Sequence, residues 1–513
     1  MLQSTHEPRV VVLARPDNAF TRDLDHDLAG PAVTTVDPDL GDWRVHGRLA
    51  GAGPLDLLVD GEEAQDHAID RFAAWFRHVR AGGCYVVPSS SPQAVERLAR
   101  FLGDLGAGRD VPLPRPERRA LAGAVADVRR DHGQLTVTRQ GRTLPKLREK
   151  EMNEALAVDP SRGRVLATVP AMEFDSRCVM RTSGRDRKDR TQEHYSAPAL
   201  YLREYLDVSC RPKSVVIQRG LVCPDTYRHH LAPSLSHKVL KDDGPRFAVT
   251  PRNEPPAPCL QGTYFHLDNE IRGFFGHALT EQVSRLWAWR QAKDLYPDIR
   301  ALLSLNRGRE IAGWELTLLE AGGIDPSEVE VIGGPTRVER LLSATPMFSM
   351  PAYVHPRITE TWDAVGAALG SHASERTYPS RIFCSRRHDR RVCTNRDEVE
   401  ALFVAHGFEV ILPEDLPLPD QVALFDQAEV IGGFAGSGMF TSMFSDRPKH
   451  LILVTPDTYG PSNEYMIGAV RGHRLDVAVG RSTSRVRKEA LRAPFAFEMA
   501  EEGAWLRAVL DRL

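Results

Sequence analysis

Short runs of apolar residues alternate along most of the chain with longer segments in which apolar residues recur every three or four positions. Short apolar runs are typical of buried strands, and the longer spacing is typical of helices that pack on them. Strands that alternate with helices predict an α/β protein with open sheets. The chain has 513 residues, which is too many for a single hydrophobic core, so we expect about three domains.

Residues 1–112 show this pattern as a small Rossmann-like domain. Apolar runs predict strands over Val10–Ala14, Ala32–Val36, Leu55–Val59 and Gly82–Val87, and helical spacing predicts helices over Ala68–Val79 and Ala94–Leu102. This order resembles part of a class I methyltransferase-like domain, in which the strand-end acids Asp37 and Asp60 would hold a ribose. The glycine loop expected after the first strand is absent, because the chain there reads Ala-Arg-Pro-Asp-Asn-Ala-Phe. We therefore expect a domain without a cofactor, with S-adenosylmethionine-dependent methyl transfer as an alternative.

Three further segments follow. Residues 113–195 contain a stretch rich in proline and charge at Pro114–Arg119 and an alternating pattern at Gln134–Arg139, which predict a linker with short strands. Residues 196–365 return to the α/β pattern, and 366–513 form the last domain. The strands expected in 196–365 include Ser214–Gln218, Ala301–Leu305 and Val329–Ile332.

The last domain carries arginines after one expected strand and glycines after another. The strand Arg381–Ser385 runs into a loop with Arg386, Arg387, Arg390 and Arg391, and the strand that begins at Glu429 runs into a loop with Gly432, Gly433, Gly436, Ser437 and Gly438. Guanidinium groups bind phosphate oxygens by charge and by paired hydrogen bonds, and glycines let backbone N–H groups face a ligand. Because parallel strands bring such loops to one edge of a sheet, the sequence predicts a diphosphate site here.

A set of motifs in fixed order extends beyond this loop pair. The chain contains Gly276-His-Ala-Leu-Thr-Glu281, the segment Pro326–Leu342, Ser385-Arg-Arg, the segment Arg391–Asn395, Gly407-Phe-Glu-Val, Pro413-Glu-Asp, Gln421-Val-Ala-Leu-Phe and Val430-Ile-Gly-Gly-Phe-Ala-Gly-Ser-Gly438. With these motifs, residues from about 196 to about 480 resemble glycosyltransferase family 61. The resemblance implies a GT-B fold of two facing Rossmann-like domains, with the acceptor side in 196–365 and the nucleotide-sugar side in 366–513. It also implies transfer with inversion from a nucleotide-sugar, usually UDP-linked, to a hydroxyl of a glycan or small-molecule acceptor, with no cofactor.

The resemblance assigns roles to the residues at matching positions. An inverting transferase needs a base for the acceptor hydroxyl and stabilisation of the departing diphosphate. His277 and Glu281 are four residues apart on an expected helix and share one face, so either His277 is the base with Glu281 orienting it, or Glu281 is the base. Arg386 and Arg387 would stabilise the leaving group. The donor would contact Ser385, Arg386, Arg387, Arg391, Gly433, Gly436, Ser437 and Gly438. Glu464 follows the expected strand Leu451–Val454 and its loop, so it would either bind a ribose or sugar hydroxyl of the donor or act as a structural cap. Asp268 and Glu270 are weaker carboxylate candidates, expected to be solvated.

Two positions of the glycine loop depart from the family pattern. Ala435 stands where the family usually has a histidine, and Thr441 stands where it usually has an asparagine. An unusual donor is therefore expected. The main alternative is a nucleotide-sugar or glycan binding protein that has lost catalysis.

Composition and charge narrow the picture further. The formal net charge of −3 argues against general binding to nucleic acid or membrane surfaces, and the seven cysteines form no CxxC pair, which indicates reduced thiols in a cytoplasmic protein. We expect no signal peptide and no transmembrane segment. Asp-x-Asp pairs occur only in the N-terminal domain (Asp23, Asp25, Asp27, Asp37 and Asp39), and His229, His230 and His237 lack a recurrent ligand spacing, so we expect no metal site. A homo-oligomer is possible, and the sequence does not decide the oligomeric state.

Overall fold

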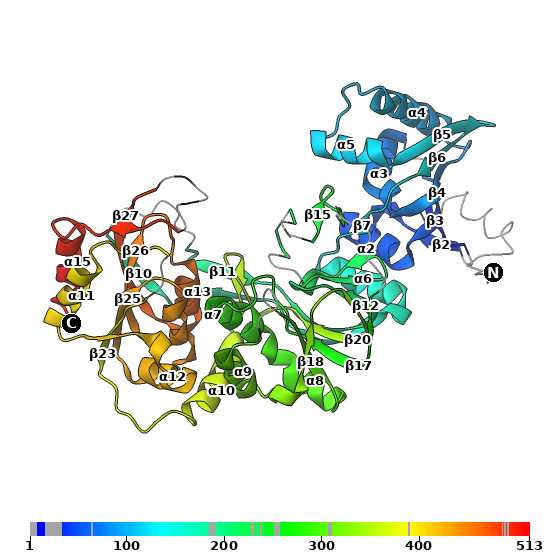
Figure 1. Ribbon diagram of the computed structural model, residues 1–513. Helices are drawn as coiled ribbons and strands as arrows, with labels where there is room; N and C mark the ends of the chain where they lie inside the picture. The colour runs from blue at the N-terminus through cyan, green and yellow to red at the C-terminus, as the bar shows by residue number, and fades with distance from the viewer. Residues whose placement is uncertain are drawn as a thin grey trace. The chain divides into compact units, whose positions relative to one another are not determined.

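The structure is a computed structural model of the chain. It describes residues 8–15, 33–62, 65–183, 191–226, 230–232, 234, 235, 237, 239–250, 257–305, 310–387, 390–484, 486, 489 and 492–513. The residues fall into two compact units. Unit 1 comprises Met1–Leu166, Arg203–Thr263 and Gly334–Ser343, and unit 2 comprises Ala167–Leu202, Tyr264–Gly333 and Ala344–Leu513. Both units combine helices with sheets, which confirms the α/β class (Figure 1). The division into four segments stays a prediction.

A six-stranded sheet opens unit 1, in the order β2-β1-β3-β4-β6-β5. Its strands are β1 (Val10–Leu13), β2 (Val33–Val36), β3 (Leu55–Asp60), β4 (Val79–Val87), β5 (Val125–Asp131) and β6 (Gln134–Arg139). The first four are parallel to their neighbours, as in a Rossmann-like domain, whereas β6 pairs antiparallel with both β4 and β5. The four strands expected in 1–112 are therefore present, and the same sheet continues past residue 112 into the expected linker.

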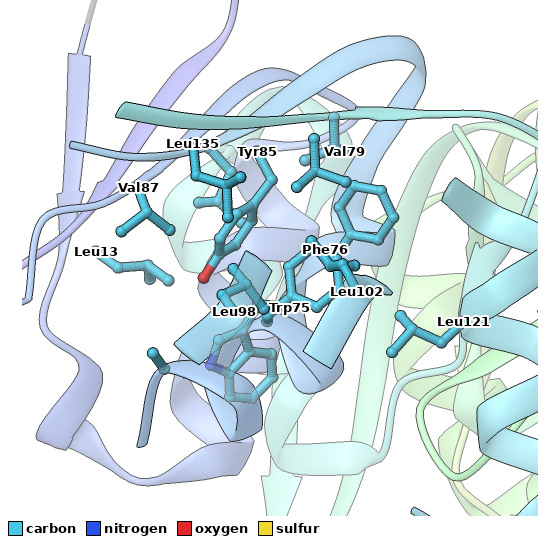
Figure 2. Packing of buried hydrophobic residues seen from close by; sticks show 14 of the residues in the cluster. Leu13, Trp75, Phe76, Val79, Tyr85, Val87, Leu98, Leu102, Leu121 and Leu135 are labelled. Atoms are coloured by element: carbon cyan, nitrogen blue, oxygen red, sulfur yellow. The ribbon is translucent and has the colours of Figure 1, made fainter. Parts of the chain in front are cut away.

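The core of this domain lies between the sheet and the helices α3 (Ala68–Trp75) and α4 (Pro92–Gly106). Tyr85 projects from β4 toward Trp75 and Leu98, and Leu102 and Phe76 lie beside them (Figure 2). Each such side chain stabilises the fold by roughly 1.5–3 kcal/mol when it leaves water. Apolar spacing along α3 and α4 therefore explains why these segments form helices on this face.

Two further helices of unit 1 pack unusually closely. They are α2 (Asp42–Ala52) and α6 (Glu149–Val158). A Cβ atom at Gly47 would lie 2.6 Å from the carbonyl oxygen of Glu151, and one at Gly51 would lie 2.6 Å from that of Ala155. The glycines are four residues apart on one face of α2, so they allow the two backbones to approach.

The rest of unit 1 contains an antiparallel arrangement of β12 (Leu200–Cys210), β13 (Val216–Gln218) and β14 (Leu221–Val222). The buried side chain of Arg162 joins this hairpin to the end of α2. Its guanidinium donates to the carbonyl oxygens of Gly51 and Gly53 and to the Gln218 side chain. Short strands β7 (Leu144–Pro145), β16 (Phe247–Val249) and β15 (Lys241–Asp242) form a second antiparallel group.

The main sheet of unit 2 contains a parallel run in the order β10-β27-β26-β25-β23-β24, and the short strand β28 (Phe495–Ala496) pairs antiparallel with β27 (Figure 1). The strands of this run are β10 (Val179–Thr182), β23 (Arg381–Cys384), β24 (Glu409–Ile411), β25 (Val430–Phe434), β26 (His450–Pro456) and β27 (Arg474–Ser482). Helices α11 (Arg396–Ala405) and α15 (Glu502–Leu510) pack on one face through Phe403, Leu506 and their neighbours. Helices α12 (Leu418–Gln427) and α13 (Ser462–Arg471) complete the strand-helix repeat. The expected strands of the last domain are present, and the edge strand β10 comes from the segment predicted as a linker.

A second parallel group of unit 2 consists of the end of β17 (Cys259–His266), β18 (Arg300–Ser304) and β19 (Val329–Ile332). A continuous helical path separates the first two strands. It runs through α7 (Phe275–His277), the π-helical turn η6 (Ala278–Gln282), the 3₁₀ segment η7 (Val283–Ala288) and α8 (Trp289–Leu295). Helices α9 (Gly313–Ala321) and α10 (Ile358–Gly370) follow. None of the helices in the described ranges has the length and apolar character needed to cross a lipid bilayer.

Candidate functional site

The loop after β23 places one guanidinium inside unit 2. Arg386 donates to the backbone oxygens of Ala435, at 3.4 Å, and Arg391, at 2.5 Å. Its Cζ atom lies 5.4 Å from the ring centre of Phe434 at the end of β25. Burial, followed by the nearby Arg391 cation, lowers the pKa of Arg386 to about 10. The side chain therefore stays charged at neutral pH in a partly buried position, where water screens its attraction for an anion less than at the open surface.

Arg391 brings a second guanidinium to the same place. Its backbone has a φ of 53°, a left-handed conformation that non-glycine residues rarely adopt. Its Cζ atom lies 3.9 Å from the ring centre of Tyr459, which follows β26. A Cβ atom built at Gly436 would lie 3.0 Å from one terminal nitrogen of Arg391 and 3.7 Å from one of Arg386. The arginine loop and the glycine loop therefore meet at Gly436, whose φ of 143° also favours glycine.

Glu464 is hydrogen-bonded to the glycine loop at Gly436. It is fully buried in the first turn of α13. Its carboxylate accepts a hydrogen bond from the Gly436 backbone N–H at 2.8 Å and another from the Tyr459 hydroxyl at 3.4 Å. Burial raises the pKa of Glu464 to about 7, against the opposing effect of Arg391. These contacts make Glu464 a positioning residue for Gly436.

The raised pKa of Glu464 predicts a pH dependence of stability. The folded state keeps the proton up to about pH 7, whereas the unfolded chain releases it near the ordinary value of 4.5. The folded state therefore binds more protons between these values, and stability falls as pH rises through this window, by roughly 3 kcal/mol at most. Glu464→Gln has no such proton and should lose this contribution. Urea unfolding of both proteins at pH 5 and pH 8 tests it, and parallel pH curves would contradict it.

His277 and Glu281 form the second part of the site. The His277 Nδ1 atom lies 2.7 Å from a carboxylate oxygen of Glu281, across the start of the π-helical turn η6. In this turn the Val283 N–H donates to the Ala278 carbonyl oxygen, five residues earlier. Such turns are rare and occur frequently at functional sites. Both side chains are partly exposed, at 28% and 18%, so a reacting group can reach them.

One close contact joins this helix start to the glycine loop. A Cβ atom at Gly276 would lie 2.7 Å from Cβ of Ser437 and 3.1 Å from the ring of Phe440. Both residues belong to the 3₁₀ segment η10 (Ser437–Phe444), which follows the glycine loop. The Arg390 Cζ atom also lies 5.8 Å from the ring centre of Phe274. Neighbours of His277 thus touch both loops that were expected to bind a diphosphate.

The other candidates have structural partners. Ser385 donates to Glu400, and the exposed guanidinium of Arg387 pairs with both oxygens of Asp415. A Cβ atom at Gly433 would meet Met439 and the backbone of Cys384, so this glycine allows close packing. Gly438 faces open space, with no atom within 4 Å of an added Cβ. The two departures from the family pattern, Ala435 and Thr441, are both buried.

Two features escaped the sequence. The ring of Tyr459 packs against the guanidinium of Arg391, and the one sequence feature that could have pointed to it is its position shortly after the end of a strand. Asp268, expected to be solvated, is buried at 3% exposure, which corrects that expectation. It accepts hydrogen bonds from the backbone N–H and the hydroxyl of Ser304, at 3.1 and 2.9 Å, and lies 3.5 Å from Arg272. Paired in this way, Asp268 ties the end of β18 in place.

The acids and histidines considered as ligands in unit 1 have other partners where the structure describes them. Asp37 accepts from the Asp39 backbone N–H, and Asp60 is bonded to Arg71 and Tyr85. His230 lies 3.5 Å from Glu149, and His237 is 2.8 Å from the Lys213 carbonyl oxygen. Asp23, Asp25, Asp27 and His229 lie outside the described residues.

Comparisons with known proteins gave matches among solved structures and among protein families. Two solved structures of MycE methyltransferase from the mycinamycin biosynthetic pathway, in complex with Mg and SAH, are each 23% identical over 21% of this chain, with a TM-score of 0.17. The chain spans about a third of their length (33% and 32%). The comparison with curated proteins gave no match. Residues 275–452 match the model of a protein family described as Glycosyltransferase 61. This segment contains His277, Glu281, Arg386, Arg391 and Gly436, and its match confirms the similarity of this part of the chain to glycosyltransferase family 61.

Proposed function

We propose that the protein is an inverting glycosyltransferase of GT-B architecture. It moves a sugar from a nucleotide-sugar donor, UDP-linked, to a hydroxyl group of a glycan or small-molecule acceptor. The observation that carries this proposal is the placement of paired arginines and a His–Glu pair on either side of one glycine loop, within the segment that matches the family. A cluster of two cations suits the diphosphate of such a donor.

In the proposed reaction, the acceptor oxygen attacks the anomeric carbon of the donor sugar. The bond from that carbon to the diphosphate oxygen breaks, and its electron pair leaves with the nucleoside diphosphate. Arg386 and Arg391 stabilise the charge that develops on this leaving group, because their guanidinium groups are fixed before the reaction. We assign this role to Arg391 in place of Arg387, because Arg387 is exposed and pairs with Asp415.

The proton of the acceptor hydroxyl goes to His277. Its Nδ1 atom faces Glu281, which leaves Nε2 for the substrate. The carboxylate fixes the ring and stabilises the imidazolium that forms. The alternative, in which Glu281 is itself the base, uses the same pair of residues.

A thermal-shift screen tests the donor. UDP should raise the melting temperature by several degrees at concentrations well above its Kd, because it binds the folded state alone. UMP should give a smaller shift, because it lacks the second phosphate that the paired arginines bind. The proposal fails if no nucleoside diphosphate shifts the wild type. If a UDP-sugar does stabilise the protein, release of UDP from it in the absence of acceptor would distinguish an enzyme from a protein that only binds the donor.

A further inference from the structure

Unit 1 contains a cavity of about 410 Å³ that the reaction above does not use. It lies between the start of β4, the end of β6 with the loop that follows, the end of α2 and the β13–β14 turn. Residues that line it include Arg77, Arg80, Arg139, Arg142, Arg219 and His78. Its volume falls in the ordinary range of small-molecule sites.

The charge of the lining is one-sided. Among the residues that the structure describes, five arginines and no aspartate or glutamate line the cavity. Two of the five are neutralised from outside, since Arg77 pairs with Asp243 and Arg80 pairs with Asp56. The other three, Arg139, Arg142 and Arg219, have no carboxylate partner among the residues that the structure describes.

Arg139 is the deepest of these three. It is 4% exposed, and it donates to the carbonyl oxygen of Val79 and the hydroxyl of Thr143. Its Nε atom and that of Arg77 are buried without a hydrogen-bond partner. Burial, followed by the charge of Arg77, lowers the pKa of Arg139 to about 10. A buried cation is costly for the fold unless an anion compensates it, and Arg139 has no carboxylate hydrogen-bonded to it in the described part of the chain, although Asp243 beside Arg77 attracts it.

The remaining lining has a different character. Leu49, Pro54, Leu144 and Leu221 contribute apolar side chains to the same cavity. An inorganic anion alone would leave this surface in contact with water, whereas a ligand with an apolar body would cover it. Arg142 and Arg219 are exposed, so they lie where a ligand would enter.

We propose that this cavity binds an organic phosphate, whose phosphate group pairs with Arg139, Arg142 and Arg219 and whose apolar body lies on Leu49, Pro54, Leu144 and Leu221. A phosphate monoester fits better than a monocarboxylate because three uncompensated cations favour a dianion with several acceptor oxygens. The site belongs to unit 1 and is separate from the donor loops of unit 2.

Calorimetric titration of the full chain with phenyl phosphate tests the proposal, with benzoate as the carboxylate arm. We expect one phenyl phosphate per chain, and at least tenfold weaker binding in Arg142→Glu. Arg119→Glu is the matched control, because Arg119 is an exposed arginine of the same unit that does not line the cavity, and it should stay within about twofold of wild type. Arg139→Gln should also bind phenyl phosphate at least tenfold more weakly, provided that this buried substitution leaves the protein folded. Arg142→Glu changes an exposed residue, so it tests the proposal even if Arg139→Gln does not fold.

Three results would overturn the proposal: no binding by the wild type, equal binding by Arg142→Glu, or tighter binding of benzoate. An Arg386→Ala variant identifies the site of binding, because it must keep its affinity for phenyl phosphate. Loss of affinity in Arg386→Ala with no loss in Arg142→Glu would place the probe in the donor site and also overturn the proposal. Failure of UDP to bind the wild type would contradict the proposed function and leave this site unaffected.

Discussion

Arg386→Ala should abolish the thermal shift caused by UDP and lower turnover at least a hundredfold. The guanidinium is partly buried beside Arg391, where water screens its attraction for a diphosphate less than at an open surface. Removing a charged hydrogen-bond donor from such a site costs about 3 kcal/mol or more of transition-state stabilisation. The measurements are melting temperature with and without UDP, and kcat and KM for the donor identified in the screen.

Arg387→Ala is the matched control for this variant. It removes the same charge one residue later in the same loop, but Arg387 is exposed and paired with Asp415. It should change turnover by less than about threefold, because exposed ion pairs contribute little. Arg386→Lys separates charge from shape, since lysine keeps the cation but cannot donate to two oxygens in a fixed plane. Equal losses in Arg386→Ala and Arg387→Ala would contradict the assignment.

His277→Ala should lower kcat by a factor of 10² to 10⁴ while donor affinity changes little. The histidine is proposed to take the acceptor proton, and the donor diphosphate is assigned to a different group of residues. Glu281→Gln can keep a hydrogen bond to Nδ1 but removes the charge that stabilises the imidazolium, so it should cost less than His277→Ala if the histidine is the base. A larger loss in Glu281→Gln would make Glu281 the base.

The readout must separate chemistry from folding. Each variant should keep the wild-type rise in melting temperature with UDP, because the diphosphate is assigned to Arg386 and Arg391 and not to this pair. Single-turnover measurements with saturating donor would then report the chemical step. Turnover near that of the wild type in both variants would remove the pair from the mechanism.

Periodicity was sufficient to predict many strands of the two largely parallel sheets, such as β1, β3, β23 and β25, but it did not reveal β5, β10 or β27. Buried strands and amphipathic helices obey local rules of spacing, so the strand Val430–Phe434 and the helix over Ala94–Leu102 were visible in the residues alone. The meeting of Arg391 with Gly436 was also expected, since parallel strands direct their following loops to one edge. What the pattern could not supply was the partner of each side chain.

Long-range pairing explains those failures. Asp268 looked like a solvated loop residue because Ser304, its partner, lies 36 residues away. The role of Glu464 depended on Gly436, 28 residues earlier. The π-helical turn was hidden as well, because its sequence has ordinary helical spacing and differs only in its hydrogen-bond pattern.

The edge strand β10 decides how the protein can be divided. It pairs in register with β27, from Val179 opposite Arg474 to Thr182 opposite Val477, although it precedes the family-like segment by almost a hundred residues. A fragment that begins at residue 196 would lack β10. The backbone N–H and C=O groups of β27, whose side chains are mostly buried, would then be unpaired along one edge of the sheet. Such an edge is a template for aggregation. The sheet of the family-like segment is therefore completed by a tetrapeptide outside that segment, and a shortened version that keeps this edge covered must begin upstream of Arg177.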